Sequence, residues 1–340
     1  MDRKLFHWII WIFLLSGLLL AVGLFSLCIG SSSIPIKEII SLPLTDRHTT
    51  EYSIIFDIRL PRIVLAFAVG GALSIAGVIF QGIFRNPLVE PYTLGVSGGA
   101  ALGVCLSIVF KLNRIFGFNL FPLVGFLGAL LAIFLVYLIS SRQGTLKITN
   151  LLLTGVMMSF ICSSLIMLIM AISRLEDLHG IIFWIMGSLE ECDWMLIKIA
   201  LLVAILGIFI SLFFAQDLNA FSLGEEEALH LGINVERTKK LLFVFASLLT
   251  GASVSVSGII GFVGLVVPHF VRMFVGQDHG ILLIASGLCG GMFLILCDTL
   301  ARTVMAPLEL PVGVITGIVG GTLFVYFLSK RQLILGTKGA

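Results

Sequence analysis

Two apolar, glycine-laced runs lie between residues 60 and 110, and a polar break at residues 81–91 separates them. The first run follows a charged, proline-marked entry, RLPR at residues 59–62, and the break reads QGIFRNPLVEP. Hydrocarbon cannot hydrogen-bond an irregular backbone, so such a break survives at membrane depth only when protein buries it or when it lines a water-filled path. The pattern therefore predicts a helical membrane protein with broken helices.

Composition supports a polytopic membrane protein with a single transmembrane domain, residues 1–340. The chain is 59% hydrophobic and 12% charged, with a mean hydropathy of +1.14, whereas soluble domains carry about 25% charged residues. Because a span needs about 20 mostly apolar residues, the stretch 238–277 is too long for one span and is divided at Gly258, Gly261 and Gly264. The ten expected spans are 8–30, 60–81, 92–110, 120–140, 148–172, 194–215, 238–259, 260–277, 281–301 and 310–328.

Both ends of the chain are expected in the cytoplasm. The apolar run from Trp8 to Gly30 is longer than the core of a secretory signal peptide and lacks a small-residue cleavage site, so it is expected to remain as the first span. Ten spans place both termini on one side of the membrane, and both termini are basic, which the positive-inside tendency assigns to the cytoplasm. The acidic loop 173–193 then lies outside.

Charge and motif content argue against several classes of protein. A net charge of +2 gives no reason to expect a nucleic-acid partner. Five of the six cysteines lie in apolar runs, Cys192 lies in a loop, and no spacing suggests a metal site or a disulfide framework. The chain has no G-x-x-x-x-G-K-[ST] motif, so ATP would have to be bound by a separate subunit. GVSGG at residues 95–99 fits the hydrolase pattern around Ser97, but it opens a glycine-rich span instead of a strand–turn–helix.

An internal repeat joins the second and seventh spans. Residues 69–79 and 250–260 align without gaps, and each copy precedes a proline-bearing polar break. Five crossings separate the copies, and an odd offset reverses direction, so the alignment predicts an inverted-topology repeat of the kind many transporters use. A chance likeness between two small-residue helices is the alternative. The identical pairs are Gly70/Gly251, Ser74/Ser255, Gly77/Gly258 and Ile79/Ile260, and the breaks are Asn86-Pro87 and Pro268-His269.

The sizeable polar insertion expected on the cytoplasmic side is residues 219–237. Ser222 and Glu225 have the spacing of a capping box, and the acidic run that follows suits the positive end of a helix. We expect a helix of about two turns that Gly232 closes. Such a helix held under the membrane can lodge in a partner's groove, although a solvated connector has the same spacing. Its acidic run is Glu225, Glu226 and Glu227, and its apolar side is Leu223, Ala228, Leu229 and Leu231.

Several charged side chains lie near or within the expected spans. Arg59, Arg62 and Arg302 fall at outer ends, where a guanidinium either grips a carboxylate in two places or snorkels to the interface. His269 lies inside an expected span, and an intramembrane histidine is a candidate proton relay. No acidic residue lies within a helical turn of His269, so a structural hydrogen bond is the favoured role.

In their order along the chain, these motifs resemble those of the permease subunits of the iron-siderophore, haem and cobalamin family of ABC importers. The resemblance runs from Arg59 to about Arg331. One departure is Thr322, where the family usually has a proline that would kink the last span. The matching motifs are RLPR, NPLVEP-x-x-LGVSGGA, SLGEEEA-x-x-LG, GFVGLVVPH-x-x-R, the Asp298/Arg302 pair and ELPVG at residues 309–313.

The resemblance implies an all-α permease of the type II ABC importer fold, with about ten transmembrane helices and an inverted repeat. It implies that three arginines receive glutamates of a binding protein, that residues 219–237 engage an ATPase, and that the NPL segment lines a cytoplasmic gate. The implied docking residues are Arg59, Arg62 and Arg302; the coupling residues are Ser222, Leu223, Gly224, Glu225, Glu226, Glu227, Ala228, Leu231 and Gly232; the gate residues are Asn86, Pro87, Leu88 and Thr149; the structural residues are Pro268, His269, Arg272 and Asp298.

The implied partners are a second copy of the chain or a related permease, two ATPase subunits that bind ATP and magnesium, an extracytoplasmic binding protein and the lipid of the inner membrane. No catalytic residue, metal or cofactor is implied on this chain. The expected cargo is a metal chelate, with ferric siderophore as the commonest family cargo and haem, cobalamin and oxyanions as alternatives. An autonomous ion-coupled carrier also fits the repeat and broken helices, but it needs carboxylates at midplane, and none is clearly placed there. An intramembrane hydrolase using Ser97 is a third reading.

Overall fold

The computed structural model describes residues 3–30, 35, 49–117, 119–141, 147–190 and 193–336, and over these ranges the chain is helical with no strand. Ten apolar helices coincide with the ten expected spans. Seven of them are long and apolar enough to cross a membrane, and α5, α14 and the part of α16 up to residue 327 are shorter. The predicted all-helical fold is therefore confirmed.

The elements follow one another as α1 (Arg3–Cys28), α3 (Thr50–Ser53), the π-helix η2 (Ile54–Arg59), α4 (Leu60–Phe84), the 3-10 helix η3 (Pro91–Leu94), α5 (Val96–Val109), α6 (Leu112–Phe116), α7 (Phe121–Ser140), α8 (Ile148–Ile172), α9 (Leu175–Met186), α10 (Trp194–Phe213), α11 (Ala215–Leu223), α12 (Glu225–His230), α13 (Val235–Ser257), α14 (Val263–Val275), α15 (His279–Thr303) and α16 (Val312–Gly336).

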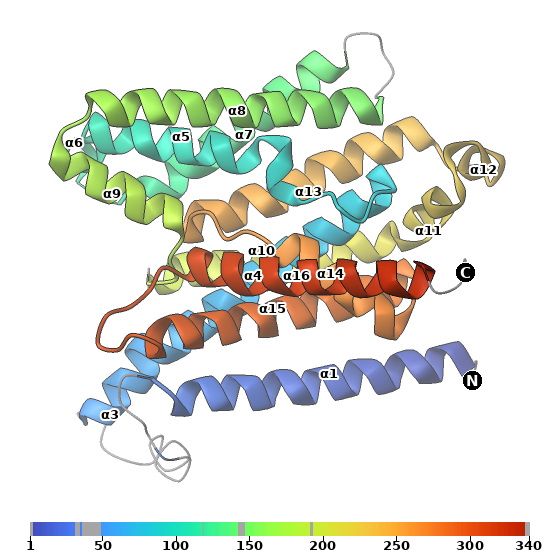
Figure 1. Ribbon diagram of the computed structural model, residues 1–340, viewed down its shortest axis with the longest axis horizontal. Coiled ribbons are helices and arrows are strands. Elements are labelled where there is room, and N and C mark those ends of the chain that lie inside the picture. Colours follow the sequence, from blue (N-terminus) through green and yellow to red (C-terminus); the bar gives the residue numbers. More distant parts are fainter. Residues whose placement is uncertain are drawn as a thin grey trace.

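The long helices lie side by side along the longest axis of the molecule (Figure 1). The start of α1, the end of α16 and the pair α11–α12 share one end, which we call the α12 end. The helices α3, α6 and α9 lie at the opposite end, which we call the arginine end because α4 begins there with Arg59 and Arg62 and α15 finishes there with Arg302. Both termini thus share an end, as the sequence predicts.

Helix α4 is the central element of the bundle. The most apolar stretch of the continuous helical segment 50–84 is 89% buried, compared with 11% for α1 and 17% for α8. A helix that is apolar all round belongs inside a core, and α4 is packed by α10, α13, α14 and α15. Helices α1 and α8 instead present broad apolar faces outward, away from the core of this chain.

Glycines bring the backbones of neighbouring helices against α4. A Cβ at Gly70 would overlap the carbonyl oxygen of Gly290 on α15, and a Cβ at Gly77 would overlap the carbonyl oxygen of Gly264 on α14. Lipid provides no hydrophobic drive for association between helices, so close backbone contact and van der Waals packing must supply the stabilisation. The small residues of the repeat are therefore the contact surface of the central helix.

The two copies of the repeat run in opposite directions. Helix α4 starts beside α3 at the arginine end, whereas α13 starts beside α12 at the other end (Figure 1). Their aligned glycines differ in conformation: Gly77 is inside α4, but Gly258 adopts φ +68° and ends α13. The second break is therefore 258–262, and the expectation of a break at Pro268-His269 is wrong, because Pro268 lies inside α14.

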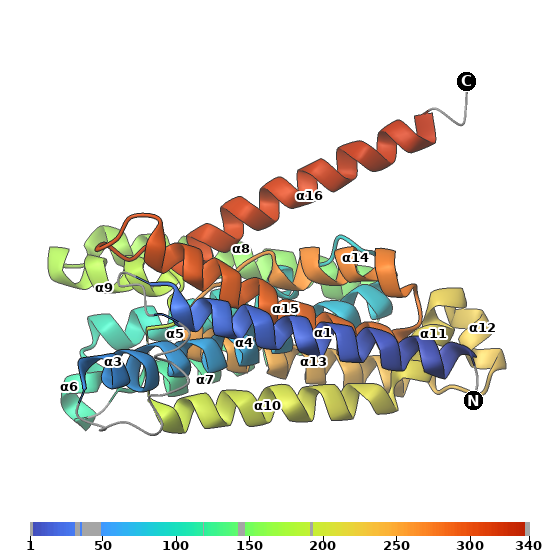
Figure 2. The same ribbon diagram turned by 90° about the horizontal axis from the view of Figure 1, so that it is seen from below.

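Three further expectations are corrected or resolved. The acidic segment 173–193 contains the helix α9, whose apolar side chains Ile181, Trp184 and Ile185 pack with residues of α5 and α8. The third span begins only at Val96, after a 3-10 turn. Helix α16 continues unbroken through Thr322, since no proline interrupts its hydrogen bonds, and it leaves the bundle obliquely toward the α12 end (Figure 2).

The cysteines of the described residues are free thiols in packed or half-packed positions, and Cys192 lies outside the described residues. They are Cys28, Cys105, Cys162, Cys289 and Cys297.

The contact between Gly77 and Gly264 gives a direct stability prediction. Gly77→Ala should lower the thermal unfolding midpoint of the purified chain, with a cost of about 1–3 kcal/mol or more, because backbone atoms of α14 must move to admit the methyl group. Gly17→Ala in α1 is the matched control: nothing lies within 4 Å of its Cβ position, and alanine favours helix by up to about 1 kcal/mol. Equal midpoints for the two variants would contradict the packing described for α4.

Candidate functional site

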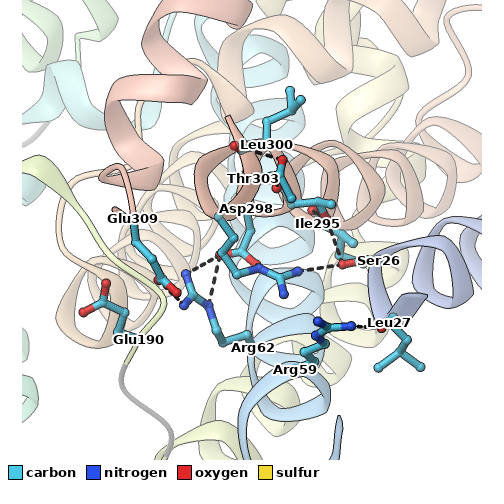
Figure 3. Close-up of polar contacts among 12 residues, drawn as sticks. Ser26, Leu27, Arg59, Arg62, Glu190, Ile295, Asp298, Leu300, Thr303 and Glu309 are labelled. Atoms are coloured by element: carbon cyan, nitrogen blue, oxygen red, sulfur yellow. Dashed lines mark hydrogen bonds and ion pairs between the residues drawn. The ribbon is translucent and has the colours of Figure 1, made fainter. Parts of the chain in front are cut away.

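A buried ion cluster closes the arginine end (Figure 3). Arg62 contacts Asp298 Oδ1 through Nη2 at 2.9 Å and through Nε at 3.2 Å, and its Nη1 lies 2.5 Å from Glu309 Oε2. Asp298 is fully buried, Arg62 is 3% exposed, and the Glu309 side chain is 39% exposed. One guanidinium therefore joins the start of α4, the end of α15 and the loop that leads into α16.

Arg302 and Arg59 extend this cluster to α1. Arg302 Nε lies 2.9 Å from Asp298 Oδ2 as an ion pair without hydrogen-bond alignment, and Arg302 Nη2 donates to Ser26 Oγ at 3.0 Å. Arg59 Nη1 donates to the carbonyl oxygen of Leu27 at 2.6 Å. The guanidinium of Arg59 also fills the space beside Gly30, where a Cβ would overlap it. The three arginines thus fasten α1, α4 and α15 together.

The burial of these arginines favours one of the two roles that the sequence left open, contact with a carboxylate, over snorkelling to the interface. Arg59, Arg62 and Arg302 are 3%, 3% and 5% exposed, and internal acceptors already bind them. They are not guanidiniums that point into solvent at the ends of spans. The reason is Asp298: a carboxylate buried one helical turn before Arg302 draws both Arg62 and Arg302 inward, because an unpaired buried charge would be far more costly.

A cavity of about 250 Å³ adjoins the cluster. Glu309 belongs to both, and Glu190 lies close to Glu309 in the same region (Figure 3). Aromatic side chains from α7 and α9 and serines from α13 form its remaining wall. Pockets for small molecules usually measure about 300–1,000 Å³, so this cavity holds at most part of a large ligand. Its lining includes Phe121, Phe183, Trp184, Ser188, Ser255 and Ser257.

The acidic helix is present at the opposite end, although its start differs from the prediction. Gly224, at φ +134°, separates α11 from α12, and the run Glu225–Glu227 forms the first turn of α12. The capping box is wrong: Ser222 Oγ donates to the carbonyl oxygen of Asn219 and does not cap α12. Gly232 follows the helix at φ +83°, as expected of a closing glycine.

Helix α12 packs against the bundle on one side and is exposed on the other. Ala228 is fully buried, and Glu225 Oε2 lies 2.5 Å from the ammonium of Lys239, which is 4% exposed. The leucines on and next to α12 instead face outward: Leu229 and Leu231 are 59% and 64% exposed, and Leu223, the last residue of α11, is 68% exposed. An apolar surface of this kind, presented on a short anchored helix outside the spans, is suited to a partner's groove.

Helix α11 connects α12 to the core. A Cβ at Gly82 would lie 2.8 Å from Leu218 Cδ2, so α11 touches the last turn of α4. Asn219 accepts the His279 backbone N–H at 2.8 Å and donates to Asp278 at 3.3 Å. Burial opposes ionisation of Asp278, but hydrogen bonds from Lys4, the Gly280 N–H and Asn219 hold its pKa below the usual value. This end is therefore tied to both α4 and α15.

The expected gate residues share the α12 end. Arg85, at φ +48°, ends α4, and the Asn86 side chain accepts the N–H of Leu88 at 3.0 Å, which forms a tight turn at Pro87. Leu88 is 52% exposed. Thr149 is exposed in the first turn of α8, which also begins at this end (Figure 1). The structure brings these residues to one end of the bundle, and their role in a gate stays a prediction.

Two residues of the first break were missed by the sequence reasoning. Glu90 accepts the backbone N–H of Phe262 at 2.5 Å, and the Tyr92 hydroxyl accepts that of Ile260 at 3.1 Å. Both side chains thus satisfy the second break of the chain. Burial raises the pKa of Glu90, while the hydrogen bond from Phe262 opposes the shift. The single carboxylate of the break, within the NPLVEP motif, was the available signal.

The PH-x-x-R motif has a structural position. Pro268 is buried inside α14, the His269 ring packs edge-on against Phe324 of α16 with 6.3 Å between centroids, and Arg272 donates to Gln81 at 3.3 Å.

Ser97 is buried in the first turn of α5, among helices, and no strand–turn–helix surrounds it within the described residues. No cluster of three or more metal-binding side chains occurs in the described part of the chain.

These features define a polytopic helical membrane protein with a buried charged end and a short exposed helix at the other end. A family model for the FecCD transport family matches residues 18–330, and the chain belongs to that family. It is 39% identical to the hemin transport permease HmuU of Yersinia pestis, over 93% of this chain and 94% of that protein. It is 37% identical to the Fe(3+) dicitrate permease FecD of Escherichia coli K12, over 91% and 95%.

The fold comparison agrees. A solved ABC transporter of the metal-chelate type, in an inward-facing conformation, aligns with a TM-score of 0.83 at 34% identity, over 94% of this chain and 98% of that chain. The cobalamin permease BtuC of Halobacterium salinarum is 41% identical over 84% of this chain and 75% of its own length. The chain is therefore the permease component of an ABC importer for metal chelates, a membrane subunit without catalytic activity of its own.

Asp298 and Glu309 give a matched test of the ion cluster. Asp298→Asn removes the one carboxylate that serves two buried guanidiniums, and breaking a buried pair costs about 3–5 kcal/mol, so the thermal unfolding midpoint should fall sharply. Glu309→Gln removes a partner whose side chain is 39% exposed, and such pairs contribute about 0–1 kcal/mol. Similar midpoints for both variants would show that the cluster does not hold the three helices together.

Glu90 gives a prediction about pH. Its raised pKa means that the folded chain binds the proton more tightly than the unfolded chain, so stability declines as pH rises from the usual value of 4.5 through the folded pKa. Glu90→Gln should remove this decline and keep an acceptor for the Phe262 N–H. Glu90→Leu leaves that N–H unpaired and should cost about 1–3 kcal/mol at all pH values. Unfolding midpoints between pH 4.5 and 8 measure both, and identical pH profiles for the parent and Glu90→Gln would contradict the assignment.

Proposed function

We propose that this chain is the permease subunit of an inner-membrane importer of ferric siderophores, driven by ATPase subunits on separate chains that bind the α12 end. The observation that carries the proposal is the anchored helix α12 with its exposed leucines, at the end where both termini lie. The α12 end is then the cytoplasmic end, and both termini lie in the cytoplasm. The basic termini support this orientation.

Coupling would be mechanical. An ATPase that binds Leu229 and Leu231 moves α12, and Gly224 connects α12 to α11, where Leu223 adds to the same exposed surface. Because Leu218 of α11 packs against Gly82 on the last turn of α4, displacement of α11 is transmitted to the segment Asn86–Leu88 that follows α4. Packed helices move as rigid bodies in such transitions. Asn86, Pro87, Leu88 and Thr149 would then form the gate at this end.

The pathway would form between two copies of the chain, or between this chain and a related permease. The cavity beside Glu309 is about 250 Å³, too small for a whole siderophore chelate. Helix α8 is only 17% buried in the isolated chain, and α16 diverges from the bundle (Figure 2). Both features support a partner permease against these helices, with a wider passage between the two.

A soluble binding protein would deliver the chelate at the arginine end. Carboxylates of that protein would compete with Glu309, the exposed member of the cluster, for Arg62. The docking role of Arg59, Arg62 and Arg302 stays a prediction, and in this structure it requires an exchange of partners on guanidiniums that are already paired. Hemin and ferric dicitrate permeases are among the relatives, which supports an iron chelate as cargo.

The exposed leucines of α12 provide the test. Leu229→Ser and Leu231→Ser should each weaken ATPase association about 30-fold, the equivalent of about 2 kcal/mol for an interface hot spot, and iron-siderophore uptake into cells should fall accordingly while membrane insertion persists. Leu175→Ser, at an 84% exposed leucine of the opposite end, is the matched control. Unchanged uptake in the α12 variants would refute the coupling role.

A further inference from the structure

A glutamine from α4 completes the hydrogen bonding of α14. Pro268 has no backbone N–H, so the carbonyl oxygen of Gly264, four residues earlier, has no helical donor. Gln81 Nε2 lies 3.2 Å from that oxygen and 3.3 Å from the carbonyl oxygen of Leu265. Gln81 is 3% exposed. A side chain from the end of α4, two residues beyond the first copy of the repeat, thus takes the place of the N–H that the proline removes.

The other end of the same amide is also occupied. Gln81 Oε1 accepts from Arg272 Nη1 at 3.3 Å, and Arg272 lies one turn beyond Pro268 on α14. The guanidinium can only donate, so it fixes the orientation of the amide, with the oxygen toward Arg272 and the NH₂ toward Gly264. The contact requires an amide at position 81, because neither leucine nor glutamate there could donate to the carbonyl oxygen of Gly264.

A second set of contacts begins nine residues further along the chain, at Glu90. Glu90 and Tyr92, on the first break, accept the N–H groups of Phe262 and Ile260 on the second break. Phe262 adopts φ +69°, a strained conformation for a bulky residue that persists only where surrounding contacts enforce it. Backbone strain of this kind clusters at functional sites and switch regions. The N–H groups of Ile260 and Phe262 in the second break are therefore bonded to side chains that follow α4 rather than to their own helices.

The side chain of Phe262 carries this connection to the last helix. A Cβ at Gly320 of α16 would lie 2.6 Å from the Cβ of Phe262, and Gly321 also faces its ring. The Phe262 side chain therefore packs against α16 at a position where only glycine leaves enough room for it. One continuous set of contacts thus runs from the end of α4, through the second break, to α16.

We propose that Gln81 and Glu90 are positioning residues that clamp residues 258–265 to residues 81–91, so that the two breaks and α16 move as one unit when α11 is displaced. The proposal rests on the importer function given above. Its mechanical input is Leu218 of α11, which packs against Gly82, the neighbour of Gln81. Its output is the position of α16, through Phe262.

Hydrogen–deuterium exchange on the native complex, purified with its ATPase and binding protein, tests this directly. We expect the peptides covering 81–92 and 258–266 to change protection together, in the same direction, when ATP is added to the nucleotide-free complex. A change in one segment without the other would overturn the proposal. So would the absence of change in both segments while the same preparation imports ferric siderophore in an ATP-dependent manner.

Gln81→Glu separates the clamp from general stability. The carboxylate keeps an oxygen for Arg272 but cannot donate to Gly264, so exchange in 258–266 should rise about tenfold relative to 81–92, and the siderophore transported per ATP hydrolysed should fall about tenfold. Gln277→Glu, the same substitution at an exposed residue between α14 and α15, is the control. If Gln81→Glu lowers only the unfolding midpoint and leaves transport per ATP unchanged, Gln81 is merely structural.

The outcomes distinguish this inference from the function on which it rests. Normal ATP-dependent uptake together with independent exchange of the two segments would leave the importer assignment standing and remove the clamp. Loss of ATP-dependent uptake in the parent complex would remove both. The exchange measurement uses the unmodified chain, so it decides the matter even if Gln81→Glu does not fold.

Discussion

The structure depends on close backbone contact around α4. This helix is enclosed on all sides, and its neighbours approach it through pairs of glycines, Gly70 with Gly290 and Gly77 with Gly264. In a membrane, helices do not associate by excluding water, so the fit of backbones and side chains must provide the stabilisation. The charged end, the breaks and the α12 end are all positioned by their attachment to this one helix: Arg62 at its start, Gln81 near its finish and Gly82 against α11.

Two buried carboxylates are satisfied by groups far away in the sequence, whereas buried hydroxyls such as that of Thr250 bond to carbonyls in their own helix. Asp298 serves guanidiniums from α4 and α15, and Glu90 serves the N–H of Phe262, 172 residues away in sequence. Burying a polar group without a partner is costly, so each such residue fixes the position of a distant segment. These long-range contacts fix how the apolar helices align with one another. They also hold the strained Phe262 at the point where the second break contacts α16.

The sequence predicts the spans well and the contacts poorly. Apolar length located the ten helices, and the ten-span count placed both termini at one end, because both properties are local. The roles of Gln81 and Glu90 were not foreseeable, since each depends on a partner many residues away. Asp298 was predicted as a structural residue next to Arg302, but its contact with Arg62 was not. The capping box at Ser222 failed because Gly224 changes the chain direction first. The three arginines share one end of the bundle, as the order of the spans predicts, but the burial of Arg62 and Arg302 follows from their contacts with Asp298.

The central claim is that an ATPase acts on the α12 end while a soluble protein delivers cargo at the arginine end. Crosslinking of native membranes, followed by mass spectrometry of the peptides joined to this chain, tests it most directly. The account predicts an ATPase linked within residues 219–240 and a soluble binding protein linked near Glu309. A chain that purifies without any ATPase, or an ATPase linked at the arginine end, would contradict it.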